Sequence, residues 1–151
     1  MDMTKQPGII FRHVYLTKLH YSLSGSEPPK EFKHALRIDV SKEIQERKEG
    51  GKRLLLTLSA DPMFGVEPKP FEMQVELLGI FDAEPNSNLP IETFADVQAP
   101  AQLVPYLREV ISNITARTPL RTLILPPINV HAFLAAKKQE PSNPPGKPSS
   151  I

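Results

Sequence analysis

The sequence predicts an α+β fold, in which a four-stranded antiparallel sheet carries two C-terminal helices packed on one face. Two observations indicate this arrangement. Four segments in the first half of the chain alternate between apolar and polar side chains, which is the period of a strand. A helical repeat of apolar residues follows them. Strands followed by helices are typical of a two-layer domain with the helices on one side of the sheet.

Two segments near the N-terminus have the strand period. Residues 9–23 place aromatic and β-branched residues on one parity, and residues 31–44 place Phe32 and Ile38 opposite charged side chains. The glycine and prolines of residues 24–30 indicate a loop between them. We therefore expect two strands that each present one apolar face.

Two further strands are expected at residues 52–60 and 71–81, the first of them preceded by the glycine pair of a hairpin turn. Leu55 makes the first of these apolar on part of both faces, which favours a central or covered position in the sheet. Gly79 breaks the alternation of the second, which indicates a bulge or a close backbone contact. The connections predict that the four strands form an antiparallel meander.

The residues after the strands predict a long helix and a short one. Residues 82–97 have little periodicity and are expected to be an irregular connection. The long helix begins at Pro100, where a missing N–H costs nothing in the first turn, or at Pro105, and it ends near Arg117. Its apolar stripe consists of Leu103, Leu107, Val110, Ile111 and Ile114. The short helix is expected at residues 129–138, with an asparagine cap.

The chain divides into three parts. Residues 1–8 are a polar segment that we expect to be flexible, residues 9–138 are the folded domain, and residues 139–151 are a proline-rich tail too polar to bury a core. The polar N-terminus lacks a secretory signal, and no apolar run approaches the ~20 residues of a membrane span. We expect a cytoplasmic protein that does not insert into membranes.

Composition and motifs argue against an enzyme. The 151 residues include no cysteine, which excludes disulfides, thiolate metal ligands and a cysteine nucleophile. The four histidines lack metal-ligand spacing, and the glycines match neither nucleotide-binding pattern. Glu72 and Glu76 share a strand face, which is typical of a solvated surface. The basic residues of the first two strands are interleaved with acidic ones, so a mixed surface is expected there. A net charge of +1 disfavours nucleic-acid binding. We expect no catalytic residues, no metal and no cofactor.

Apolar surface is the remaining feature that could carry a function. Apolar residues occur on both faces of parts of the predicted sheet, whereas the helices can cover one face only. The loops at 24–30 and 61–70 could fold over the remainder. Burial against a partner subunit or a ligand is the stronger interpretation.

Short motifs in a fixed order resemble the SecB family of protein-export chaperones. They are the Val-Tyr-x-Thr-Lys of residues 14–18, the Gly-Ile-Phe of 79–81, the Pro-Tyr-x-Arg-Glu of 105–109, and the leucine- and proline-containing run of 117–133. The similarity covers residues 9–138. It implies an ATP-independent holdase that binds unfolded preproteins or antitoxins in apolar grooves, and a homotetramer built as a dimer of dimers.

The resemblance also implies two sets of functional residues. The client groove would be lined by Leu23, Phe32, Ile128, Val130, Phe133 and Leu134. The strand that pairs subunits would contribute Met73, Val75 and Leu77. Simpler interpretations remain open, because the last helix could merely dock through its apolar residues and the second set could be ordinary sheet core.

The resemblance implies SecA as a partner, but one feature of the sequence disfavours it. Family members that deliver clients to this motor carry acidic residues on the sheet surface, where this chain has Leu19, Leu23 and Gln74. Two other functions remain open. The chain could be a non-enzymatic interaction or assembly subunit with one fixed protein partner, or it could carry a small apolar ligand under its helices.

Overall fold

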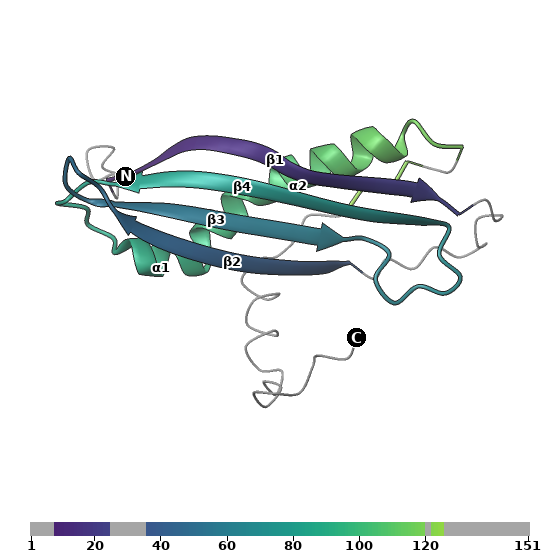
Figure 1. Ribbon diagram of the computed structural model, residues 1–151, viewed down its shortest axis with the longest axis horizontal. Helices are drawn as coiled ribbons and strands as arrows, with labels where there is room; N and C mark the ends of the chain where they lie inside the picture. Colours follow the sequence, from purple (N-terminus) through teal and green to yellow (C-terminus); the bar gives the residue numbers. More distant parts are fainter. Residues whose placement is uncertain (1–7, 25–35, 120–121, 126–151) are drawn as a thin grey trace, which may run out of the picture.

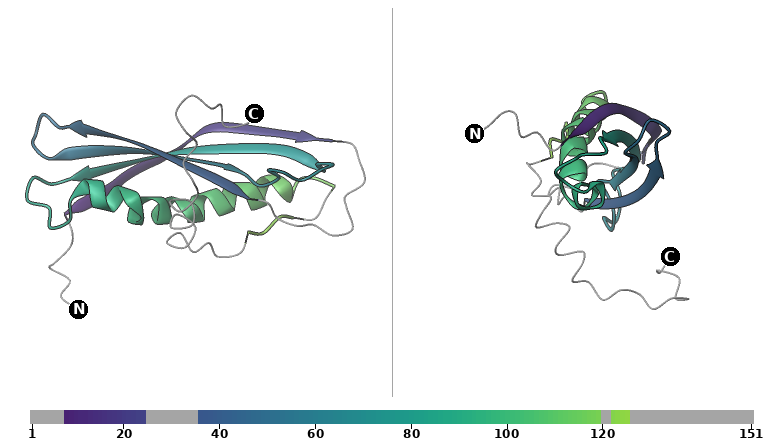
Figure 2. Two further views of the ribbon diagram at one scale, coloured as in Figure 1. Left: turned by 90° about the horizontal axis from the view of Figure 1, so that it is seen from below. Right: turned by 90° about the vertical axis from the view of Figure 1, so that its left-hand side faces the viewer.

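The structure is a computed structural model that describes residues 8–24, 36–119 and 122–125. Four antiparallel strands form one layer and two helices form a second layer on one face (Figures 1 and 2). The elements are β1 (Ile9–Leu23), β2 (Arg37–Glu46), β3 (Lys52–Asp61), β4 (Phe71–Ala83), α1 (Ile91–Asp96) and α2 (Gln98–Thr115). Figure 1 views the face opposite the helices, here called the open face, and α2 crosses behind the sheet on what we call the helix face.

The strand order is β1-β4-β3-β2. The predicted meander is therefore right for β2, β3 and β4 but wrong for β1, which pairs with β4 at the opposite edge from β2. The expected central position of the strand that contains Leu55 is confirmed, because β3 lies between β4 and β2. β2 begins at Arg37, and residues 31–35 of the strand expected there lie outside the described part of the chain.

β1 contains two irregularities that change which side chains face the helices. Its pairing with β4 shifts register between Phe11 and His13 and again between Leu16 and Lys18. Each extra residue reverses the alternation, because side chains change face at every residue along a strand. The single parity expected for residues 9–23 is therefore wrong: Phe11 and Leu19 lie on the helix face, whereas His13 lies on the open face opposite Ile80.

α1 occupies part of the segment that was expected to be an irregular connection. It buries Ile91, Phe94 and Ala95 under the sheet, and the ring of Phe94 contacts that of Phe81 at 5.2 Å between centroids. Ion pairs between Lys52 and Glu92 at 2.9 Å and between Lys42 and Asp96 at 3.1 Å join α1 to β3 and β2. A helix of six residues is too short to produce a visible apolar repeat.

α1 and α2 form one bent helix, because Val97 between them has a non-helical backbone with φ −134°. Pro100 lies in the first turn of α2, as predicted, whereas Pro105 lies inside the helix and does not begin it. The second C-terminal helix expected at 129–138 lies outside the described residues.

The core lies between α2 and the two central strands. Leu103, Leu107 and Ile111 of α2 are completely buried. They pack in one hydrophobic cluster with Leu54, Leu56, Leu58, Met73, Val75, Leu77 and Phe81. Gly79 allows the helix to come close, since a Cβ there would lie 2.9 Å from Cδ2 of Leu103 and 3.0 Å from Cε2 of Phe81. The close contact expected at Gly79 is confirmed, and the bulges lie in β1 instead.

Gly79→Ala should therefore destabilise the protein. The added methyl overpacks a filled core, and we expect a loss of about 1–3 kcal/mol in the free energy of unfolding. Leu103→Ala should cost about 2–5 kcal/mol by leaving a cavity. The double variant should lose clearly less than the sum, because each change relieves the other, and urea unfolding measures all three. Additive losses would show that the two residues do not meet.

Candidate functional site

The first candidate surface is a row of leucines on β1, here called the β1 strip: Leu16, Leu19 and Leu23. Their pairing opposite Leu77, Val75 and Phe71 places them on the helix face. They are nevertheless 49%, 41% and 42% exposed. These side chains face the layer that should bury them and are not covered by it.

The position of α2 explains why the β1 strip is uncovered. α2 packs mainly on β4 and β3, and toward β1 the ring of Tyr106 lies edge-on to that of Phe11 at 5.9 Å. β1 is also an edge strand of 15 residues, so one side of its backbone has no neighbouring strand among the described residues. An exposed, long and apolar edge strand is a surface on which another chain can pair.

The open face carries a second apolar surface, here called the open-face patch: Ile10, Tyr15, Leu55, Leu78 and Ile80. Ile10 and Tyr15 are 39% and 48% exposed, and the other three are half-buried. Tyr15 pairs with Leu78, and Ile80 pairs with Leu55 on β3. The patch therefore lies toward the end of the open face where β1 begins and β4 ends, and neither described helix lies on this face.

A buried ionic cluster, here called the arginine cluster, borders this patch. The carboxylate of Asp82 is 2% exposed. It accepts hydrogen bonds from Nε and Nη2 of Arg53 at 2.7 and 3.0 Å and from Nε of Arg12 at 3.0 Å, and Nε of Arg47 lies 3.8 Å away. Hydrogen bonding by Arg53, and then by Arg12, lowers the pKa of Asp82 against the opposing effect of burial.

Sequence reasoning did not find this cluster. The sequence contains its components: an acidic residue directly after Phe81 near the end of the fourth strand, and arginines near the starts of two other strands, Arg12 and Arg53. Only the pairing of β1 and β3 with β4 brings these residues together.

The chain returns along α2 after the helix ends. Thr115 is 1% exposed, and its hydroxyl donates to the carbonyl of Ile111 and accepts from the backbone N–H of Leu123 at 2.9 Å. Nε of Arg108 donates to the carbonyl of Leu125 at 3.2 Å. Leu123 and Leu125 are buried, and Ile124 between them is 70% exposed. This segment thus presents one further apolar side chain to solvent.

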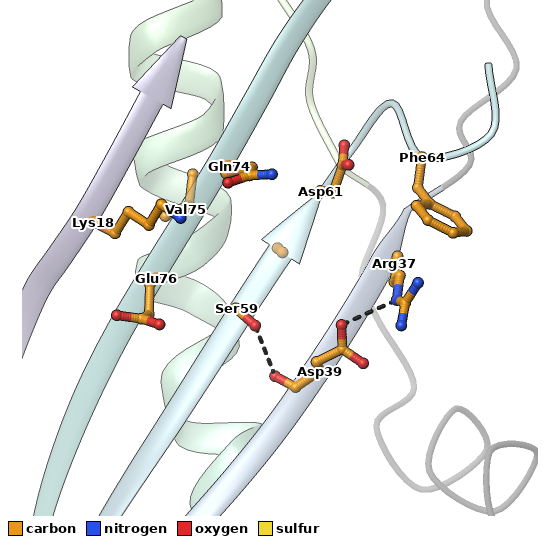
Figure 3. Close-up of a pocket in the computed structure, with 10 residues that line it drawn as sticks. Lys18, Arg37, Asp39, Ser59, Asp61, Phe64, Gln74, Val75 and Glu76 are labelled. Atoms are coloured by element: carbon orange, nitrogen blue, oxygen red, sulfur yellow. Dashed lines mark hydrogen bonds and ion pairs between the residues drawn. The ribbon is translucent and has the colours of Figure 1, made fainter. Parts of the chain in front are cut away.

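A cavity of about 320 Å³ lies on the open face beside the end of β3 (Figure 3). Lys18, Gln74 and Glu76 lie along one side of it, and Arg37 and Asp39 lie on β2 at the other. The charges are mixed, as expected from the sequence.

Most charged groups in this cavity already have partners. Arg37 donates to Asp39 at 3.0 Å and lies over the ring of Phe64 at 4.6 Å. The hydroxyl of Thr17 donates to the carboxylate of Glu76 at 2.8 Å. This charged cavity on the open face is therefore not the apolar pocket under the helices that the small-ligand alternative requires. Among the described residues, no group of acidic and histidine side chains could hold a metal ion.

The predicted site residues have three outcomes. Leu23 is exposed at the end of β1. Met73, Val75 and Leu77 are only 1–2% exposed and form sheet core within one protomer, which is the alternative that the sequence left open. Phe32, Ile128, Val130, Phe133 and Leu134 lie outside the described residues.

The structure also shows on which face of the sheet the three residues lie that replace the family's acidic ones. Gln74 lies on the open face, as expected for the fourth strand. Leu19 and Leu23 lie on the helix face, because the second bulge of β1 reverses the alternation. The residues that β1 presents to the open face in this region are Lys18, His20 and Ser22.

Comparisons with known proteins identify the family. The family model described as preprotein translocase subunit SecB matches residues 3–141. The chain belongs to the SecB family. This family consists of non-enzymatic chaperones, so the chain is a SecB-like chaperone and not an enzyme.

Relatives of this SecB-family chain include export proteins. The protein-export protein SecB of Psychrobacter cryohalolentis is 26% identical over 136 residues, which cover 89% of this chain and 90% of that protein. An uncharacterised protein of Methanocaldococcus jannaschii is 28% identical over 123 residues, which cover 80% of this chain and 79% of the relative.

A solved structure supports the same fold. The SecB-like chaperone Rv1957 of Mycobacterium tuberculosis, in complex with a ChAD peptide from the antitoxin Rv1956 HigA1, superposes with a TM-score of 0.59. The match covers 80% of this chain and 90% of Rv1957, at 15% identity. None of the helices in the described part of this SecB-family chain is long and apolar enough to cross a membrane.

Asp82→Asn tests the arginine cluster. It should lower the free energy of unfolding at neutral pH by about 1.5–3 kcal/mol, because charge-assisted hydrogen bonds to a buried carboxylate are lost. The folded-state pKa of Asp82 is below its ordinary value of 3.8, so its stabilising contribution is present above that pH and is lost as the pH falls through the lowered pKa.

The difference between wild type and Asp82→Asn in urea unfolding should accordingly shrink in acid. Asp39→Asn is a matched control, because its pair with Arg37 is exposed and should change stability by less than about 1 kcal/mol. A difference for Asp82→Asn that stays constant from neutral to acidic pH would contradict the assignment.

Proposed function

We propose that this SecB-like chaperone is an ATP-independent holdase, which binds non-native polypeptides on apolar side chains that the protomer leaves uncovered. The observation that carries the proposal is the apolar surface that the protomer leaves uncovered outside the proposed subunit contact: Leu23 is 42% exposed and Ile124 is 70% exposed. Burying a whole leucine contributes about 1.5–3 kcal/mol, so covering the exposed part of each contributes roughly 1 kcal/mol. Such burial has no directional requirement and suits clients of many sequences.

The proposed client groove begins at Leu23 and continues over the apolar residues of the C-terminal segment. Leu23 is the described member of this set, and Ile124, in the segment that runs back along α2, adds a strongly exposed apolar side chain. The proposed remaining members are Phe32, Ile128, Val130, Phe133 and Leu134. An extended client could also hydrogen-bond to an open strand edge.

We propose that the chain acts as a homotetramer, a dimer of dimers, whose subunits pair along the free edge of β1. Leu16 and Leu19 lie in the middle of this edge strand and would be buried by a second copy. Pairing would remove the aggregation hazard of a long unpaired edge. The core under α2, including Val75, would support this edge from beneath.

The proposed site of action is the cytoplasm, and the proposed clients are preproteins or an antitoxin. The antitoxin possibility is supported by the solved complex of Rv1957 with its antitoxin peptide. SecA remains a possible partner, although Lys18 and His20 stand on the open face of β1 without acidic neighbours on that strand.

Client binding is tested by the aggregation of several unrelated unfolded proteins in the presence of stoichiometric chaperone. Leu23→Ser and Phe133→Ser should each weaken suppression of aggregation by several-fold, because each removes apolar contact area. Tyr15→Ser is the matched control, since Tyr15 is equally exposed but lies on the open face. It should leave suppression unchanged.

Two results would contradict the holdase proposal. Suppression of none of these clients, together with co-purification of one constant protein, would favour a fixed assembly subunit. Equal loss of suppression in Tyr15→Ser and Leu23→Ser would show that the helix face has no special part in client binding.

Subunit pairing is tested by light scattering coupled to size exclusion. The wild type should have the mass of a tetramer, and Leu19→Glu should reduce it to a smaller species, because a carboxylate would be buried at the pairing edge. Glu76→Gln on the open face is the control and should keep the wild-type mass. A wild type that runs as a monomer would contradict the proposed assembly.

A further inference from the structure

The open face combines exposed apolar and cationic side chains at one end of the sheet. Ile10 is paired with Asp82, which is in turn paired with Arg53, so the arginine cluster directly adjoins the open-face patch. Arg12 is the extra residue of the first bulge of β1, and it lies between Ile10 and Tyr15 in the chain. The two surfaces therefore form one continuous area on the side of the sheet opposite the β1 strip.

The arginine cluster has more positive than negative charge. Three guanidinium groups surround the single buried carboxylate of Asp82. Glu49, which binds Arg47 at 2.9 Å, is 80% exposed and is a weak counter-charge in water. Within the described part of the chain, Arg12 is bound through Nε alone, which leaves its two terminal nitrogens to donate elsewhere.

These groups are both fixed and accessible. The side chains of Arg12 and Arg53 are 42% exposed, while their contacts with Asp82 hold them in place. A guanidinium that is already positioned loses less side-chain entropy when it binds a partner. Tyr15, 48% exposed, lies further along the same face, where its ring stacks on that of His13 at 5.5 Å between centroids, and His13 in turn pairs with Ile80. Tyrosine and arginine are the residues that most often anchor protein interfaces.

The other end of the open face has a different character. There Arg37 is paired with Asp39, Lys18 lies opposite Glu76, and Nε2 of His20 lies 3.9 Å from the carboxylate of Glu72, so each of these basic groups has an acidic neighbour. Complementarity to a negatively charged partner is therefore confined to the end that holds the arginine cluster.

We propose that this end of the open face docks a segment of a partner protein in which acidic and apolar side chains alternate. A carboxylate of the segment accepts hydrogen bonds from the terminal nitrogens of Arg12. Its apolar side chains pack on Tyr15 and Ile80. This site is separate from the client groove, so the chaperone could hold a client on the helix face while an acidic partner occupies the open face.

The test measures fluorescence anisotropy of two labelled peptides with the full-length protein. One peptide alternates glutamate and leucine, and the other has lysine in place of glutamate. The glutamate peptide should bind, more weakly as salt is raised from about 50 to 500 mM, and the lysine peptide should not compete with it. Arg12→Gln and Tyr15→Ser should each lower its affinity about tenfold.

Arg12→Gln keeps the two hydrogen bonds from Arg53 to Asp82, so it should fold normally, as circular dichroism can verify. Arg37→Gln is a matched control on the same face, and Leu23→Ser separates this site from the client groove; both should bind the glutamate peptide like the wild type. The proposal is overturned if the peptide does not bind, if both peptides bind alike, or if Leu23→Ser weakens binding and Arg12→Gln does not.

Discussion

The packing of Leu103 against Gly79 is the contact on which the rest of the structure depends. It lets α2 approach the backbone of β4 and fixes the helix over the two central strands. A helix presents an apolar stripe that is narrower than a sheet of four strands, so a single helix in this position cannot bury every apolar side chain on the helix face. The leucines of β1 are uncovered because of this geometry.

The bulges of β1 then decide which chemistry appears on each face. Without them, Leu19 and His13 would lie on the same side of the sheet, because they share one parity. With them, residues 13–16 change sides, so that Leu16 faces the helices and Tyr15 faces outward, and after the second bulge Leu19 and Leu23 are again on the side of Phe11. One strand thus supplies apolar side chains to the helix face, where we propose client and subunit binding, and an aromatic and cationic set to the open face. The two surfaces can be altered independently by mutation.

The strands, the start of α2 and the family could be predicted from the sequence, because alternation and short motifs are local signals. The close contact at Gly79 was also visible as a break in that alternation. The position of β1 beside β4, at the edge opposite β2, could not be predicted, and neither could the arginine cluster around Asp82. Both depend on which strands pair. The bulges were missed because an extra residue leaves no mark in the sequence of a strand whose two faces both carry apolar groups. α1 was missed because six residues are less than two helical turns.

The central claim is that non-native chains are held on apolar side chains of the helix face. Site-specific photo-crosslinking tests it most directly, with a benzophenone side chain at position 23 and, in a second protein, at position 41 on the open face of β2. An unfolded client should crosslink strongly from position 23 and weakly from position 41, and the same client after folding should crosslink from neither. Equal crosslinking from both positions, or equal crosslinking of the folded and unfolded client, would contradict the account.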